Sequence, residues 1–183
     1  MKKLNTDRVA GSVVAAIVAA AVNLAVYFLG PYQMLADRVS HQTFPESRFG
    51  YTKIDLEKFF GNLVVEACDI PQEFLQAYAN LQYLDIAVAA MSALVLASLI
   101  WTFVDSAEHR GSSGLLIVLP ASMFVCEIAE NLFLGYFAGS TLRGFNSDLV
   151  AVGSAVTQAK WIFVSMSAIS VVFLAARHWT ARR

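Results

Sequence analysis

The chain has 183 residues, of which 57% are hydrophobic and only 15% are charged, and its formal net charge at pH 7 is -1. Its mean hydropathy of +0.58 is far above that of an ordinary soluble domain and indicates an integral membrane protein. The charge includes no global excess of basic residues, which argues against a nucleic-acid partner.

Four apolar runs are long enough to cross a bilayer, since a hydrocarbon core of about 30 Å requires roughly 20 helical residues. No linker, repeat or low-complexity segment divides them, so we predict a single four-span domain over residues 1–183. The first run follows a basic start like that of a signal peptide, but it exceeds the roughly 7 to 15 apolar residues of a signal sequence, and we expect an uncleaved span. The predicted spans are residues 9–29, 84–104, 115–137 and 156–176.

Basic residues near the ends of the spans predict the orientation in the membrane. With four spans they fall on one side, whereas the long loop over residues 30–82 falls on the other and is richer in acidic residues. By the positive-inside rule we predict a multi-pass protein of the cell (inner) membrane with both termini in the cytoplasm. The residues on the basic side are Lys2, Lys3, Arg8, Arg110, Arg177, Arg182 and Arg183.

The outer loop is predicted to be helical. Thr52-Lys53-Ile54-Asp55 has the form of a capping box, with Asp in place of the usual Glu, and it opens an amphipathic stretch. Such a helix lies in the headgroup plane, folds over the bundle as a lid or only covers its end. A second helix start follows at Asp69 and Pro71, and no breaker appears before Gly111. We therefore predict an all-α integral membrane four-helix bundle with an extracytoplasmic amphipathic helix and an extended second helix.

Polar residues inside the spans fall at one depth. With a rise of about 1.5 Å per residue, Glu127 and Glu130 lie in the outer half of the third span, and Lys160 lies a turn or so below the outer end of the fourth. Asn23 and Asp85 occupy the same layer on the first two spans. A charge facing lipid costs about 2.5 to 3.5 kcal/mol, so these side chains turn inward. The sequence thus predicts a polar, carboxylate-lined pocket in the outer half of the bundle.

The charges of this pocket are unbalanced. Asp85, Glu127, Glu130 and Lys160 would sum to -2 if all were ionised. Two carboxylates one helical turn apart do not both ionise easily in a low dielectric, so either one is protonated or a cation fills the deficit. The alternative is purely structural: Glu130, Asn131 and Lys160 form an interhelical ion pair that fixes the register of the helices.

Several polar motifs stand at fixed positions: Glu127-x-x-Glu130-Asn131 in the third span, Thr157-x-x-Lys160 in the fourth, Tyr83-x-Asp85 at the start of the second, and Phe49-Gly50-Tyr51 in the outer loop. Together they resemble an uncharacterised family of small four-span integral membrane proteins with a D/E-x-x-E-N motif and a later T-x-x-K. This resemblance implies the four-span fold and no particular activity. A weaker likeness is to EXPERA proteins, sterol isomerases and sterol-binding receptors that also use acidic residues inside a four-helix bundle.

Three kinds of function fit this pocket. In the first, the bundle binds a membrane lipid or another lipid-like or cationic amphiphile that enters from the outer leaflet. In the second, it is an intramembrane lipid-modifying enzyme in which one glutamic acid, its pKa raised by burial, acts as general acid or base and Lys160 stabilises developing negative charge. In the third, it is an assembly or scaffold subunit, as a homo-oligomer or with a membrane-protein partner. A transporter is less attractive because the inner half of the spans offers no polar path.

The site residues follow from these hypotheses. We expect no cofactor; magnesium or calcium could bind through carboxylate and amide oxygens of the third span, but nothing in the sequence requires it. The candidate catalytic groups are Glu127, Glu130 and Lys160, and the candidate ligand-binding residues are Asn23, Tyr83, Asp85, Asn131, Thr157 and Trp161.

Overall fold

The computed structural model describes residues 6–29, 32, 35, 43–65, 71–105 and 114–180. These residues form five α-helices and three short 3-10 helices, and no strand occurs among them. The α-helices are α1 (Thr6–Leu29), α3 (Lys53–Val65), α4 (Pro71–Asp105), α6 (Val118–Ser140) and α7 (Ser147–Thr180), and the 3-10 helices are η1 (Pro45–Ser47), η2 (Gly114–Ile117) and η3 (Thr141–Arg143).

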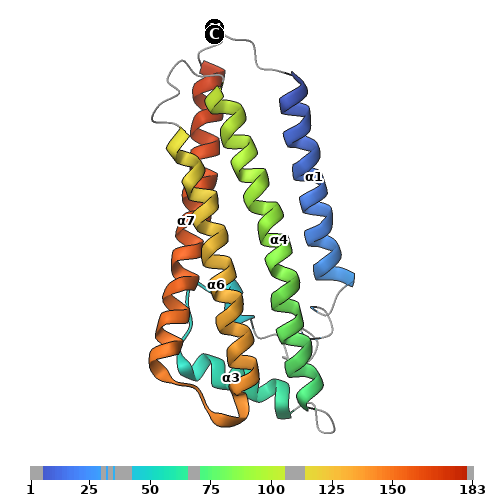
Figure 1. The fold of residues 1–183 in the computed structure, drawn as a ribbon, viewed down its shortest axis with the longest axis vertical. Helices are drawn as coiled ribbons and strands as arrows, with labels where there is room; N and C mark the ends of the chain where they lie inside the picture. The colour runs from blue at the N-terminus through green and yellow to red at the C-terminus, as the bar shows by residue number, and fades with distance from the viewer. Residues whose placement is uncertain are drawn as a thin grey trace.

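Four of the α-helices run lengthwise beside one another, and α3 lies across one end of them (Figure 1). Helices α4, α6 and α7 pack against each other, and α1 packs along α4. Helix α6 runs antiparallel to α4 and α7 (Figure 1). The end that carries α3 is called the α3 end below.

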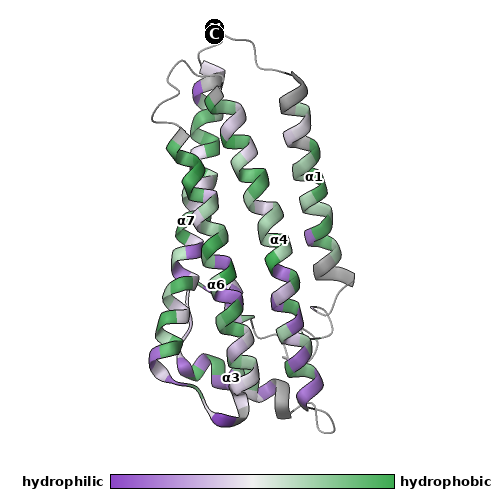
Figure 2. Cartoon of the chain, in the orientation of Figure 1, coloured by the Kyte–Doolittle hydropathy of each residue, from purple (hydrophilic) through white to green (hydrophobic). Residues whose placement is uncertain are grey.

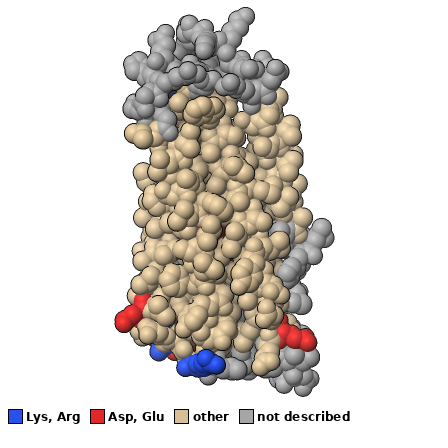
Figure 3. Space-filling view, in the orientation of Figure 1, with Lys and Arg blue, Asp and Glu red and all other residues tan. Residues whose placement is uncertain are grey.

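Three helices are long and apolar enough to cross a membrane: Gln72–Val104, Leu115–Ser140 and Ser147–Arg177. Helix α1 contains a shorter apolar stretch, Ala10–Ala25. Hydrophilic residues gather in the half of the bundle nearest the α3 end (Figure 2). In the face shown by Figure 3, the coloured charged side chains lie only at that end, below an uncharged flank. These features are those of a membrane protein.

The sequence predicts two helix starts in the outer loop, and the first of them, at Thr52, lies among the described residues. Thr52 and Asp55 form the reciprocal bonds of a capping box: the Thr52 N–H donates to Asp55 Oδ2 (2.8 Å), and the Asp55 N–H donates to Thr52 Oγ1 (3.2 Å). The bonds from Thr52 lower the pKa of the Asp55 carboxyl. The start predicted at Asp69 lies outside the described residues, but α4 is one continuous helix from Pro71, as the extended second helix requires.

Helix α7 begins nine residues before the predicted span. The side chain of Asn146 caps it, since its Oδ1 accepts hydrogen bonds from the N–H groups of Asp148 (2.9 Å) and Leu149 (3.2 Å). Lys160 therefore lies about 20 Å along the helix from its start.

A cluster of buried aromatic side chains fills the α3 end. Phe59 and Phe60 of α3 contact the ring of Tyr78 on α4 edge to face, with centroids 5.4 and 5.2 Å apart. Phe44, just before η1, packs against Phe59 and Tyr78. Since these rings are almost fully buried, they join α3 and the η1 segment to the bundle. The cluster also includes Tyr51, Phe137 and Phe145.

Candidate functional site

A buried ion pair joins α6 and α7. The Lys160 ammonium group contacts Glu130 Oε2, and Thr157 Oγ1 donates to the other Glu130 oxygen (2.6 Å). Glu130 and Thr157 are fully buried and Lys160 is 5% exposed. An ion pair this well buried is held only when its remaining hydrogen-bonding capacity is also satisfied, as it is here.

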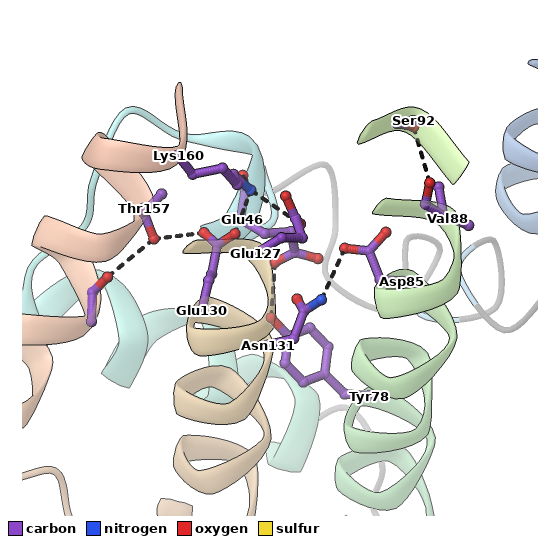
Figure 4. Close-up of polar contacts among 11 residues, drawn as sticks. Glu46, Tyr78, Asp85, Val88, Ser92, Glu127, Glu130, Asn131, Thr157 and Lys160 are labelled. Carbon is purple, nitrogen blue, oxygen red and sulfur yellow. Dashed lines mark hydrogen bonds and ion pairs between the residues drawn. The ribbon is translucent and has the colours of Figure 1, made fainter. Parts of the chain in front are cut away.

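Two further acceptors surround Lys160. Its Nζ lies 3.5 Å from Glu127 Oε1 and donates to the backbone carbonyl oxygen of Glu46 (3.2 Å). An ammonium group has three N–H donors, so these two oxygens and the Glu130 carboxylate account for all of them. Figure 4 shows Glu46, Glu127 and Glu130 gathered around Lys160.

Glu46, in η1, is a member of the site that the sequence did not indicate. The Tyr78 hydroxyl donates to its Oε2 (2.9 Å). Burial raises the pKa of the Glu46 carboxyl to about 7, although this bond and one from the Glu46 backbone oppose the shift. The fold therefore favours the protonated form of this carboxyl group.

The η1 segment is held in place by its close approach to α7. The Tyr51 N–H donates to Ser154 Oγ (2.9 Å). Gly50 has φ +94, and a Cβ there would lie 2.7 Å from Gln158 Nε2. A Cβ on Gly153 would lie 2.8 Å from the Tyr51 hydroxyl oxygen. Two glycines, one on each side of the contact, thus allow the backbones to meet, and this contact brings Glu46 to Lys160.

Asp85 approaches the same region from α4. Its Oδ2 accepts a long hydrogen bond from Asn131 Nδ2 (3.5 Å), while Asn131 Oδ1 is buried without a hydrogen-bond partner in the described part of the chain. In Figure 4 the Asp85 carboxylate points toward Glu127 across the space between α4 and α6. This region therefore contains the carboxyl groups of Glu46, Asp85, Glu127 and Glu130 and one ammonium group, that of Lys160.

A cavity of about 280 Å³ lies between α1, α4, α6, α7 and the η1 segment. It has a polar part and an apolar part. Polar lining residues are Asn23, Tyr32, Glu46, Ser47, Gln82, Asp85, Ser92, Glu127, Lys160 and Trp161, and apolar ones are Leu81, Val88, Ala89, Leu96, Met123 and Val164.

The predicted site residues fall into three groups: those that line the cavity, those that lie next to it, and Tyr83, which does neither. Five line the cavity: Asn23, Asp85, Glu127, Lys160 and Trp161. Three lie next to it in the helix packing and do not line it: Glu130, Asn131 and Thr157.

Tyr83 is the predicted ligand-binding residue that the structure does not bring to the others. It is 64% exposed and does not line the cavity. Consecutive helix residues point about 100° apart, so Tyr83 cannot share the inward face of its neighbour Gln82 and of Asp85. Gln82, which was assigned to the loop, lines the cavity instead and is 2% exposed. Its spacing of three residues from Asp85 on one helix was a signal that could have identified it.

The individual polar groups differ in how they are satisfied. Asn23 Nδ2 donates to the carbonyl oxygen of Ala19 in its own helix (2.9 Å). Lys160 Nζ lies 5.2 Å from the ring centroid of Trp161, within the range of a cation–π contact. Gln82 Oε1 and Trp161 Nε1 are buried and have no hydrogen-bond partner among the described residues.

The described residues contain no group of three or more His, Cys, Asp or Glu side chains placed to hold a metal ion. Glu127 and Glu130, two of the oxygen donors considered for magnesium or calcium, both contact the Lys160 ammonium group instead.

Comparisons of the chain with protein-family models, with curated proteins and with solved structures found no match. The resemblance carried by the motifs of the spans therefore stays a prediction.

Proposed function

We propose that this chain is a four-span protein of the cell (inner) membrane that binds an amphiphilic, lipid-like molecule in the cavity between α1, α4, α6 and α7. The polar end of the ligand lies among Glu46, Asp85 and Glu127, and its apolar part extends along α4. Both termini lie in the cytoplasm, and α3 and η1 lie outside.

The observation that carries this proposal is the direction in which the cavity changes from polar to apolar. On α4 the lining residues nearest the α3 end are Leu81, Gln82 and Asp85, and those farther away are Val88, Ala89, Ser92 and Leu96. The amide and carboxyl groups therefore lie nearest the α3 end, and Ser92 is the single polar lining residue that the structure describes on α4 beyond them. On α7 Val164 lies one turn beyond Lys160 in the same direction.

Helix α6 shows the same change with its sequence order reversed. It runs antiparallel to the other two, so Met123, four residues before Glu127, also lies farther from the α3 end. Three helices thus build one site with a polar end and an apolar end. From Leu81 to Leu96 it spans about 22 Å of α4. Such a site complements a molecule with a head and a tail.

The fourth span is supported by the position of α1. It has 24 residues, enough for about 36 Å of helix, and it lies alongside α4. Ser12 and Thr102 share a buried hydrogen bond (3.2 Å) between the two helices. Polar pairs of this kind join helices inside membranes.

The first experiment is mass spectrometry of small molecules that co-purify with the folded protein. The parent is compared with Glu127→Gln, which changes the polar end, and with Ser92→Leu, which fills the apolar part. Ser98→Leu is the matched control: both serine hydroxyls donate to carbonyl oxygens of α4 itself, but only Ser92 lines the cavity.

We expect one lipid-like species to be retained by the parent and by Ser98→Leu and to be depleted in the other two variants. Equal amounts of unselected lipid in all four proteins would contradict the proposal and favour a structural role for the polar residues.

A lipid-modifying enzyme is the second candidate. The observation that favours it is that Glu127 lines the cavity and lies 3.5 Å from Lys160, so an acid or base faces the bound molecule and the ammonium group compensates the negative charge that develops on Glu127. An enzyme requires that Glu127→Gln retain the co-purifying molecule but lose its conversion to product, whereas a binding protein shows no conversion in either form.

A further inference from the structure

We propose that the polar end of the ligand carries a protonated amine, an inference that rests on the proposed function and names the class of its ligand. The amine would donate to oxygens of Glu46, Asp85, Glu127 and Gln82. The donors and acceptors of the cavity wall that already have partners decide which head group fits.

The wall contains more carboxyl groups than cationic groups. Glu46, Asp85 and Glu127 line the cavity, and Lys160 is the sole cationic side chain among the described residues that do so. In the described part of the chain, the ion pairs of Lys160 are with Glu127 and Glu130 and do not include the carboxyl groups of Glu46 and Asp85. Taking carboxylates out of water is costly unless a cation or several donors compensate. A cation bound among them would supply this compensation.

Lys160 is not available to a ligand. The carboxylate of the fully buried Glu130 compensates its charge. Its three N–H groups point to the backbone oxygen of Glu46 and to the carboxylate oxygens of Glu127 and Glu130. An anionic head group, such as a phosphate or carboxylate, would find no free ammonium donor here and would face three carboxyl groups. The site therefore selects against anions.

A second observation indicates a donor on the ligand. Gln82 is 2% exposed, forms part of the cavity wall, and its Oε1 is buried without a hydrogen-bond partner among the described residues. A buried amide oxygen left without a donor costs about 1 to 3 kcal/mol, and the N–H of an ammonium group would satisfy it. The unpartnered indole N–H of Trp161 would in turn donate to a neutral oxygen of the ligand.

The probes for this proposal share a tail and differ in the head group. The cavity volume of about 280 Å³ suits a small head group with a short alkyl tail. Octylamine, 1-octanol and octanoate are suitable probes. They are cationic, neutral and anionic, respectively, near neutral pH.

Binding is followed by the fluorescence of Trp161. The chain has 3 tryptophans, and the other two, Trp101 and Trp179, are 51% and 67% exposed, so a Trp101→Phe, Trp179→Phe background leaves one reporter in the cavity wall. Protein in an uncharged maltoside detergent is titrated with each probe. Glu127→Gln and Glu46→Gln are compared with Glu73→Gln, a matched change at an exposed position of α4 outside the cavity.

Octylamine is expected to bind at least about tenfold more tightly than 1-octanol, with octanoate weakest. Glu127→Gln and Glu46→Gln should each reduce the preference for octylamine over 1-octanol severalfold without weakening the binding of 1-octanol. Glu73→Gln should leave this preference unchanged. Equal binding of octylamine and octanol would overturn the amine proposal and leave amphiphile binding intact. If none of the probes binds, and the co-purified lipids are unselected, both proposals fail.

Discussion

The ammonium group of Lys160 donates to the backbone carbonyl oxygen of Glu46, 3.2 Å away and 114 residues earlier in the chain. This bond connects the middle of α7 to the η1 segment, and the same ammonium group is paired with Glu130 on α6. The ion pair therefore holds three parts of the molecule together: two long helices and the segment that closes the polar end of the cavity.

Removing one member of this pair should be costly. We expect Lys160→Met or Glu130→Met to lower the free energy of unfolding by about 3 to 5 kcal/mol, because each leaves a buried partner uncompensated. The double replacement should cost much less than the sum of the two single ones, since no orphan charge remains. The free energies of unfolding of the parent, the two single variants and the double variant are measured by denaturation in mixed detergent.

The double variant also tests the scaffold hypothesis. If it folds and still retains the co-purifying molecule, the ion pair has a purely structural role. A double variant as unstable as the sum of the single ones would show that the two residues do not act as a pair.

Glu46 should make stability depend on pH. Its pKa is 4.5 in the unfolded reference and about 7 in the folded protein, so the fold favours the protonated form. Its stabilising contribution is present below about pH 4.5, is lost as the pH rises to about 7, and amounts to about 3 kcal/mol. Glu46→Gln mimics the protonated group, and its advantage over the parent should grow across this pH range. Parallel stability curves for the two proteins would refute the assignment; Glu73→Gln is the control.

The contact between Tyr51 and Gly153 can be tested by loss and rescue. Gly153→Ala places a Cβ 2.8 Å from the Tyr51 hydroxyl oxygen and should destabilise the protein by about 1 to 3 kcal/mol. Adding Tyr51→Phe removes that oxygen and should restore most of the loss. Gly139→Ala on α6 meets nothing within 4 Å and should be neutral or slightly stabilising. Failure of the rescue would mean that the phenol oxygen is not the obstacle.

The proposed topology predicts which positions are open to each side of the membrane. In a background with Cys68→Ser and Cys126→Ala, a cysteine replacing Asp148, exposed at the start of α7, should react with an impermeant maleimide added to intact cells. A cysteine replacing Arg177, exposed near the end of α7, should react only after permeabilisation. The opposite pattern would reverse the orientation, and labelling of both in intact cells would exclude the spanning of α7.

The parts of the structure that follow local rules could be predicted from the sequence. The capping box at Thr52 and Asp55 depends on two side chains three residues apart, and the structure contains it. The inward position of Glu127, Asp85 and Lys160 follows from the cost of exposing charge to lipid. The start of α7 was missed because its first turns are less apolar than the span, although Asn146 is a typical cap.

The parts that depend on long-range packing could not be predicted. Glu46 reaches the cavity because Gly50 and Tyr51 dock on α7 about 100 residues later, and no local pattern records that contact. Gln82 falls in the predicted loop because hydropathy rises only after it, whereas α4 is helical from Pro71. The two residues supply the acceptors on which the amine proposal depends.

The position of α1 has a consequence for how the cavity is reached. In the described part of the chain it packs against α4 and has no comparable packing with α6 or α7 (Figure 1). The α3 end, by contrast, is covered by α3 and the buried aromatic cluster. For a ligand dissolved in the bilayer, a route beside α1, where it lacks packing with α6 and α7, would break the fewest helix contacts, and the ligand would enter sideways between helices. For such a route, the partitioning of the molecule into the lipid, rather than its concentration in water, governs how often the cavity is filled.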